Sequence, residues 1–180
     1  MFFFFLFSTD LKKDVLIQTY SEHTTTLYTY CKIDKHKISC EGKEHALSIE
    51  HIVPVDYFSR ALQSTLKKKK QLPFLDLKKK LPEIVIFKKD AHNQILEPPF
   101  INNLRSNLPF RDSETYFFKK IIPISSSSFA IQPDRVILPE NYSRGFVARA
   151  FLYVQWKYQR NILTEEDLQL FEEWDNLYPP

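Results

Sequence analysis

Glycine is almost absent from this chain of 180 residues, which contains only Gly42 and Gly145. Phosphate-binding loops and dinucleotide-binding motifs need several glycines, because their backbones adopt positive φ angles or approach a phosphate closely. The scarcity therefore excludes nucleotide-dependent kinases and Rossmann dehydrogenases. Hydrophobic residues make up 43% and charged residues 26% of the chain, which is typical of one globular domain with an apolar core.

The spacing of apolar residues predicts an α+β fold, a mostly helical single domain around a small β element. Helices are expected in five segments: residues 8–20, residues 55–67, a segment that begins at Pro98 or Pro99, residues 146–158, and a segment that follows Thr164. Thr164 and Asp167 have the spacing of a capping box. Four residues are expected on the buried side of the last helix: Leu168, Phe171, Trp174 and Leu177. Extended segments are expected at 24–31, 46–53 and 90–96, the last as a strand or a short hairpin.

Charge is unevenly distributed, although the net charge is only +3. Ten Lys and Arg residues stand against three acidic residues from Arg60 to Asp90, whereas one Arg stands against six acidic residues from Arg160 onward. The basic segment, expected as a surface insertion at about residues 60–89, is suited to binding a polyanion. Lysine runs are also common as plain solvated surface, so both interpretations stay open.

Residues 1–7 resemble the apolar part of a signal peptide, without the basic segment that normally precedes it. They are far too few to span a bilayer, which takes roughly 20 apolar residues. A residual export signal and a buried first strand are both compatible with this segment. We expect no membrane insertion.

Four residues with zinc-binding side chains have the spacing C-x₄-H-x₃-C-x₄-H: Cys31, His36, Cys40 and His45. This spacing matches none of the usual zinc-finger signatures. A disulfide between Cys31 and Cys40, or two free thiols, are the alternatives.

Glu50 and His51 are neighbours within the apolar extended run Ser48-Ile-Glu-His-Ile-Val-Pro54. Neighbouring side chains of a strand point to opposite faces, so one of the two faces the core unless the backbone bends or both lie at a cleft. A buried carboxylate needs a cationic partner, which a metal ion, a lysine or an arginine would provide. A Glu-His pair at the edge of a strand is the simpler explanation of the dipeptide alone.

The segment from Asp90 to Asn107 is rich in asparagine, and three of its asparagines fall within the expected helix. Asparagine forms helices poorly, so this concentration calls for a further reason. On a helix, Asn102 and Ser106 share one face, with Arg105 nearby. An amide oxygen is a suitable ligand for a hard cation such as Mg²⁺.

A strand with Glu-His, a hairpin with His-Asn and a helix with Asn nine residues after Asn93 form the layout of a ββα-metal nuclease site. The chain resembles the bacterial endonuclease I family of periplasmic and secreted non-specific nucleases. The resemblance extends from about Ser8 to Pro179, and its motifs are specific in combination. The matching blocks occur in family order: Tyr30-Cys31, Glu50-His-Ile-Val-Pro54, Asp90-Ala-His-Asn93, Asn102-Asn-Leu-Arg-Ser-Asn107, Arg144-Gly-Phe-Val-Ala-Arg-Ala150 with Tyr153, and Leu163 to Trp174 with Tyr178-Pro179.

The resemblance implies a nuclease domain at residues 8–180 with His51 as the general base. It also implies that Glu50 and Asn102 hold one divalent cation, Mg²⁺ or another such as Mn²⁺ or Ca²⁺. Arg149 is implied to be a further catalytic residue on a helix near the site. Five residues are implied to support the site, three in the hairpin and two in the helix or at the phosphate: Asp90, His92 and Asn93, and Arg105 and Asn107.

The activity implied by the resemblance is hydrolysis of phosphodiester bonds in DNA, and also in RNA, without sequence preference and with 5′-phosphate products. The protein is expected to act as a monomer in the periplasm or after secretion, and a Cys31–Cys40 disulfide would agree with export. Relatives continue past the position of Pro180 through a basic, Asn-rich tail. The alternative is therefore a catalytically impaired or inactive nuclease-like domain that binds nucleic acid.

Overall fold

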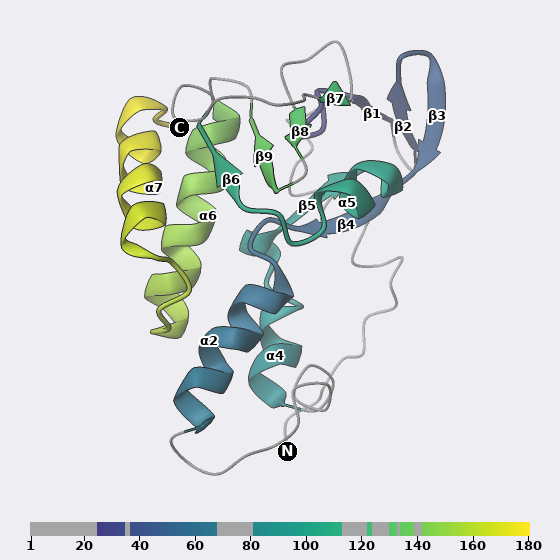
Figure 1. Cartoon of the computed structure of the whole chain (residues 1–180). Coiled ribbons are helices and arrows are strands. Elements are labelled where there is room, and N and C mark those ends of the chain that lie inside the picture. The colour runs from purple at the N-terminus through teal and green to yellow at the C-terminus, as the bar shows by residue number, and fades with distance from the viewer. Residues whose placement is uncertain are drawn as a thin grey trace.

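The structure is a computed structural model that describes residues 25–34, 37–67, 81–112, 122–123, 130–132, 134–138 and 142–180. The expected helix at 8–20, the apolar segment 1–7 and the centre of the basic segment lie outside the described residues. Helices and sheets are both present, which confirms the α+β class. Figure 1 shows two long helices, α6 and α7, side by side at one end and a projecting hairpin, β2–β3, at the opposite side.

Three short strands form the sheet at the projecting end, in the order β1-β2-β3 (Lys32–Asp34, Lys37–Cys40 and Lys43–Ala46). The turn between β2 and β3 consists of Glu41 and Gly42, which have φ angles of 49° and 77°. Two consecutive residues with positive φ are what a tight two-residue hairpin turn requires. Gly42, one of the two glycines in the chain, is therefore needed for the positive φ angle of this turn.

The expectation of an extended segment at 24–31 is wrong. Thr25 makes a single bridge with Lys32, and the chain then turns at 27–29. The hydroxyl of Thr26 accepts a hydrogen bond from the backbone N–H of Cys31 at 3.0 Å and lies 2.8 Å from the hydroxyl of Thr29. Threonine side chains that bond to nearby backbone in this way compete with strand pairing, and here they stabilise a turn.

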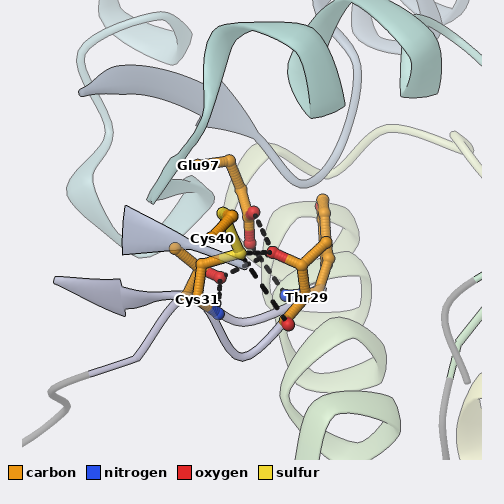
Figure 2. Close-up of a disulfide and its surroundings, with 6 residues drawn as sticks. Thr29, Cys31, Cys40 and Glu97 are labelled. Atoms are coloured by element: carbon orange, nitrogen blue, oxygen red, sulfur yellow. Dashed lines mark hydrogen bonds between the residues drawn. A yellow bond between two sulfur atoms is a disulfide. The ribbon is translucent and has the colours of Figure 1, made fainter. Parts of the chain in front are cut away.

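Cys31 and Cys40 form a disulfide with an S–S distance of 2.07 Å, which joins the turn to strand β2. Because both thiols are used, the zinc hypothesis is wrong, and His36 lies outside the described residues. Figure 2 shows Thr29 beside the disulfide, and its hydroxyl donates to the Cys31 sulfur at 3.1 Å. The disulfide packs in a small apolar cluster with Ile38, Leu47 and Leu96.

The centre of the molecule is an antiparallel pair of strands, β4 (Ser48–His51) and β5 (Gln94–Glu97). The strand expected at 46–53 is thus shorter, because the chain bends at 52–53 before Pro54. Helix α5 (Pro99–Arg105) follows β5 and begins at a proline, as expected. The segment expected as a strand or hairpin at 90–96 is a single turn of 3₁₀ helix, η1 (Ala91–Asn93), followed by β5.

Helices α2 (Val55–Lys67) and α4 (Pro82–Phe87) flank this centre, and α2 confirms the helix expected at 55–67. The Phe58 and Phe87 rings join the two helices as a stacked pair with centroids 4.3 Å apart. A third sheet has the order β6-β9-β8-β7, with strands Phe110–Arg111, Arg135–Ile137, Ala130–Gln132 and Ile122–Pro123. No helix within the described part of the chain is both long enough and apolar enough to cross a membrane.

Helices α6 (Tyr142–Tyr158) and α7 (Glu165–Leu177) pack against each other. Thr164 and Asp167 form the expected capping box at the start of α7. Phe171 and Trp174 are buried, as expected, but Leu177 is 60% exposed, so its expected burial is wrong. Leu177 is the last residue of α7.

Candidate active site

A cavity of about 290 Å³ lies between strand β4, helix α5 and the start of helix α2. Glu50, His51 and Asn102 are among the residues that line it, although Asn102 lies more than 50 residues further along the chain. The cavity is lined by nine residues: Glu50, His51, Pro54, Val55, Asn102, Asn103, Arg105, Ser106 and Asn107. Four of the expected supporting or catalytic residues do not line it: Asp90, His92, Asn93 and Arg149.

Arg105 is the cationic partner of Glu50. Its guanidinium is 1% exposed and its Nη1 donates to Glu50 Oε1 at 3.0 Å. The same guanidinium donates to the backbone carbonyls of His51 and Ile52, where the chain bends after β4. It also lies over the ring of Phe110, 4.7 Å from the centroid. Arg105 therefore fixes both the carboxylate of Glu50 and the backbone on either side of the bend.

Burial determines the ionisation of Glu50. Removal from water raises the pKa of this carboxyl to about 7, against the opposing effect of Arg105, which favours the charged form. Because the pKa of Glu50 is about 7, a cation bound in the cavity would favour the ionised form of this carboxyl. Only one carboxylate oxygen is paired with Arg105 at 3.0 Å.

Hydrogen-bonding groups of Lys88 and Gln94 orient the imidazole of His51. Its Nε2 lies 3.1 Å from the carbonyl oxygen of Lys88. The same nitrogen lies 3.3 Å from the side-chain amide nitrogen of Gln94, so a backbone group and a side chain together orient the ring. The side-chain amide of Gln94, which pairs with His51 in the β4–β5 register, donates to the same carbonyl.

Strand β4 also fixes the side chain of Asn102. Its Nδ2 donates to the carbonyl oxygen of Ile49 at 3.0 Å and to Ser48 Oγ at 3.2 Å. Both amide hydrogens are then used by β4, so Oδ1 is the atom left to act as a ligand. The orientation of this amide is thus set by its hydrogen-bond partners rather than by helix α5 alone.

The donors at this cavity fit a hard divalent cation. Glu50 and Asn102, which line the cavity from β4 and α5, carry side-chain oxygens, and Mg²⁺ prefers oxygen ligands and normally keeps several waters. The cavity has room for those waters. Across the described ranges, no group of three His, Cys, Asp or Glu side chains is placed to hold a metal ion. The oxygen-bearing side chains here that could hold such an ion include the carboxylate of Glu50 and the amide of Asn102.

Asn93 braces the bend that follows His51. Its Oδ1 accepts from the backbone N–H of Val53 at 2.7 Å, and its Nδ2 donates to the Val53 carbonyl at 3.0 Å. The backbone N–H of Ile52 donates to the Asn93 carbonyl at 3.1 Å. Asn93 is fully buried, so these bonds are shielded from water. Helix η1 and the bend after β4 are thereby held as one unit.

Asp90 connects η1 to helix α6. Its Oδ1 accepts from the backbone N–H of His92 at 3.2 Å, while its Oδ2 accepts from Lys157 Nζ and Tyr158 Oη, each at 2.9 Å. Burial acts to raise the pKa of Asp90, but the bonds from Lys157 and Tyr158 outweigh it and lower the pKa. The Asp90 carboxylate therefore stays ionised and neutralised by Lys157.

Arg149 lies on α6 with its guanidinium directed to α7 rather than to the cavity. It donates to Asp175 Oδ1 at 3.2 Å and to the carbonyl oxygen of Tyr178 at 2.9 Å. Arg149 is not among the residues that line the cavity. Asn107 does line the cavity, in the turn that follows α5, and its side chain is exposed.

Glu97 is a buried carboxyl that the sequence reasoning missed. It accepts from the backbone N–H of Tyr28 at 2.8 Å and from the Thr29 hydroxyl at 3.4 Å, as Figure 2 shows for Thr29. Burial raises the pKa of Glu97 to about 8. Its position after the apolar pair Ile95-Leu96 in a short strand is the signal that could have revealed it.

Strands β4 and β5 and helix α5 thus hold the cavity that Glu50, His51 and Asn102 line. A protein-family model described as Endonuclease I matches residues 5–180. The chain therefore belongs to the endonuclease I family and is a nuclease. It is also similar to an extracellular deoxyribonuclease from Aeromonas hydrophila, with 26% identity over 184 residues that cover 93% of this chain and 76% of that protein.

Proposed function

We propose that this protein is a divalent-metal-dependent endonuclease that hydrolyses phosphodiester bonds of DNA, and also of RNA, without sequence preference. The observation that carries the proposal is the meeting of Glu50, His51 and Asn102 at one cavity. The A. hydrophila relative is a deoxyribonuclease, which supports DNA as a substrate.

In the proposed reaction, the imidazole of His51 takes a proton from the attacking water. The new P–O bond forms as the bond from phosphorus to the 3′ oxygen breaks, which leaves a 5′-phosphate and a 3′-hydroxyl. Glu50 and Asn102 would hold the divalent cation, Mg²⁺ in the first instance, which when bound neutralises charge at the phosphate and the leaving oxygen. Histidine suits this role because its charge changes near neutral pH.

Other residues of the unit are assigned to positioning. Arg105 and Asn93 keep the strand end and the bend in place, so that the base and the ligands keep their spacing. Asn107 and its neighbour Asn103 present neutral amides at the cavity, and such groups contact phosphate and sugar rather than identify bases. Arg149 is assigned to the α6–α7 contact and not to the reaction.

Secretion, and action as a monomer, belong to the same proposal. The A. hydrophila relative is extracellular, and disulfides such as Cys31–Cys40 persist in oxidising compartments. The alternative of an inactive nucleic-acid-binding domain needs neither a base nor metal ligands. The presence of Glu50, His51 and Asn102 at one cavity supports the enzyme over this alternative.

Conversion of supercoiled plasmid tests the function. The wild-type protein should nick and degrade plasmid with Mg²⁺ and stop in EDTA, and His51→Ala should lose about 10²–10⁴-fold of the rate. Circular dichroism of His51→Ala should show an intact fold, and the same preparation serves as the control for contaminating nuclease. Cutting by His51→Ala at the wild-type rate would refute the role of His51. Plasmid that is bound but never cut by the wild type would favour the inactive domain.

A further inference from the structure

Aromatic side chains gather on the surface where helix α6 meets η1. Trp156 is 71% exposed, which is unusual because tryptophan is normally highly buried. Tyr153 precedes it by about one helical turn, and the two ring centroids are 6.3 Å apart. The ring of His92, on η1, lies 4.7 Å from that of Tyr153 at an interplanar angle of 30°. We call His92, Tyr153 and Trp156 the aromatic strip.

The aromatic strip is fixed in place and carries a cation. Tyr153 Oη lies 3.3 Å from His92 Nδ1, and His92 is in turn bonded to Asp90. Lys157 Nζ lies 5.1 Å from the centroid of the Tyr153 ring and 2.9 Å from Asp90 Oδ2. The carboxylate of Asp90 is buried and paired with Lys157, so its repulsion of a phosphate is offset.

The chain links the aromatic strip directly to the candidate active site. His92 is followed by Asn93, which holds both the N–H and the carbonyl of Val53. The next residue, Gln94, pairs with His51 across the β4–β5 register. One short rigid segment therefore carries a ring of the strip and the residues that position the proposed base.

We propose that the aromatic strip binds the unpaired bases of single-stranded nucleic acid by stacking. This proposal rests on the proposed function and names a substrate class for it. Exposed rings stack on any base, because every base has a flat π-face. Bases inside a duplex are already stacked on their neighbours. The strip therefore favours single strands over duplexes of the same sequence.

Tryptophan fluorescence in EDTA tests this binding without cleavage. The chain has two tryptophans, and Trp174 is 1% exposed, so quenching by added oligothymidylate should come from Trp156. Trp156→Phe should abolish the quenching while it keeps most of the affinity. Trp156→Ala should weaken oligothymidylate binding on the order of tenfold, measured by anisotropy of a labelled oligomer, and should change duplex binding less than about twofold.

Leu177→Ala is the matched control, since Leu177 is 60% exposed on α7 and lies outside the strip. It should bind oligothymidylate as the wild type does. Unchanged affinity in Trp156→Ala, or an equal loss in Leu177→Ala, would overturn the proposal. A change in sedimentation of Trp156→Ala without a change in binding would assign the strip to a second copy of the chain and overturn it too. Because no metal is present, these results are independent of the plasmid assay with His51→Ala.

Discussion

Replacement of Arg105 by methionine removes one charged group from a buried pair and leaves the other. Methionine keeps an unbranched apolar side chain against Phe110, but it loses every donor to Glu50 and to the backbone carbonyls of His51 and Ile52. With Glu50 ionised, removal of one partner of a buried ion pair costs about 3–5 kcal/mol. A buried carbonyl without a donor adds a loss of about 1–3 kcal/mol. Since domains are stable by about 5–15 kcal/mol, Arg105→Met should remove a large part of the free energy of unfolding.

The loss should depend on pH in a defined direction. Burial raises the pKa of Glu50 to about 7, and Arg105 opposes this rise, so the pKa in Arg105→Met lies higher still. At pH 5 Glu50 is protonated in both proteins, and only the backbone hydrogen bonds differ. At pH 8 the wild type has an ion pair, whereas the variant must keep Glu50 protonated or bury it unpaired. The difference in unfolding free energy between the two proteins should therefore be larger at pH 8.

Urea unfolding in EDTA, followed by circular dichroism at pH 5 and pH 8, measures both effects. Arg149→Met is the matched control, because its partner Asp175 is 42% exposed and a pair of this kind contributes about 0–1 kcal/mol. The double variant Glu50→Gln/Arg105→Met should lose the pH dependence that Arg105→Met adds. A loss below about 1 kcal/mol for Arg105→Met at pH 8, where about 3–5 kcal/mol is expected, or equal losses at both pH values, would refute this reasoning.

Two further predictions concern groups outside the cavity. Burial raises the pKa of Glu97 to about 8 from an ordinary 4.5, so the folded state favours the neutral acid and stability should fall between these pH values, by up to about 5 kcal/mol. Glu97→Gln should flatten this fall in urea unfolding across pH, and an unchanged slope would contradict the assignment. A Cβ on Gly145 would lie 1.9 Å from the carbonyl oxygen of Tyr178, so Gly145→Ala should lower the thermal midpoint, with a destabilisation of about 1–3 kcal/mol. An unaltered midpoint would contradict this prediction, because it would show that Tyr178 can move away from the added Cβ at little cost.

Local signals in the sequence predicted the helices better than the strands. Proline at the start of α5 and the Thr164–Asp167 capping box act through backbone groups within one turn, so they could be identified without the fold. The turn at 27–29 could not, because β-branched and aromatic residues there indicated a strand. Hydrogen bonds made by threonine hydroxyls, and one that Glu97 accepts from Thr29, 68 residues away, stabilise the turn instead.

The site could be predicted as a set of residue types but not as a set of contacts. The need for a cation beside Glu50 followed from burial, yet the identity of Arg105 as that cation depended on how α5 crosses β4. The partner of His51 is the backbone carbonyl of Lys88, and a backbone group carries no sequence signal at all. The motif alone indicated that Arg149 belongs to the site, whereas in the structure its guanidinium, on α6, donates to Asp175 on α7.

Binding of Mn²⁺, followed by electron paramagnetic resonance, tests most directly whether Glu50 and Asn102 form a metal site beside a separate base. The wild type should bind the ion at one site, and Glu50→Gln and Asn102→Ala should each weaken binding by roughly tenfold or more. His51→Ala should retain the wild-type affinity, because the imidazole is assigned to the water and not to the metal. Undiminished binding in Glu50→Gln, or a loss in His51→Ala as large as in Asn102→Ala, would contradict the account.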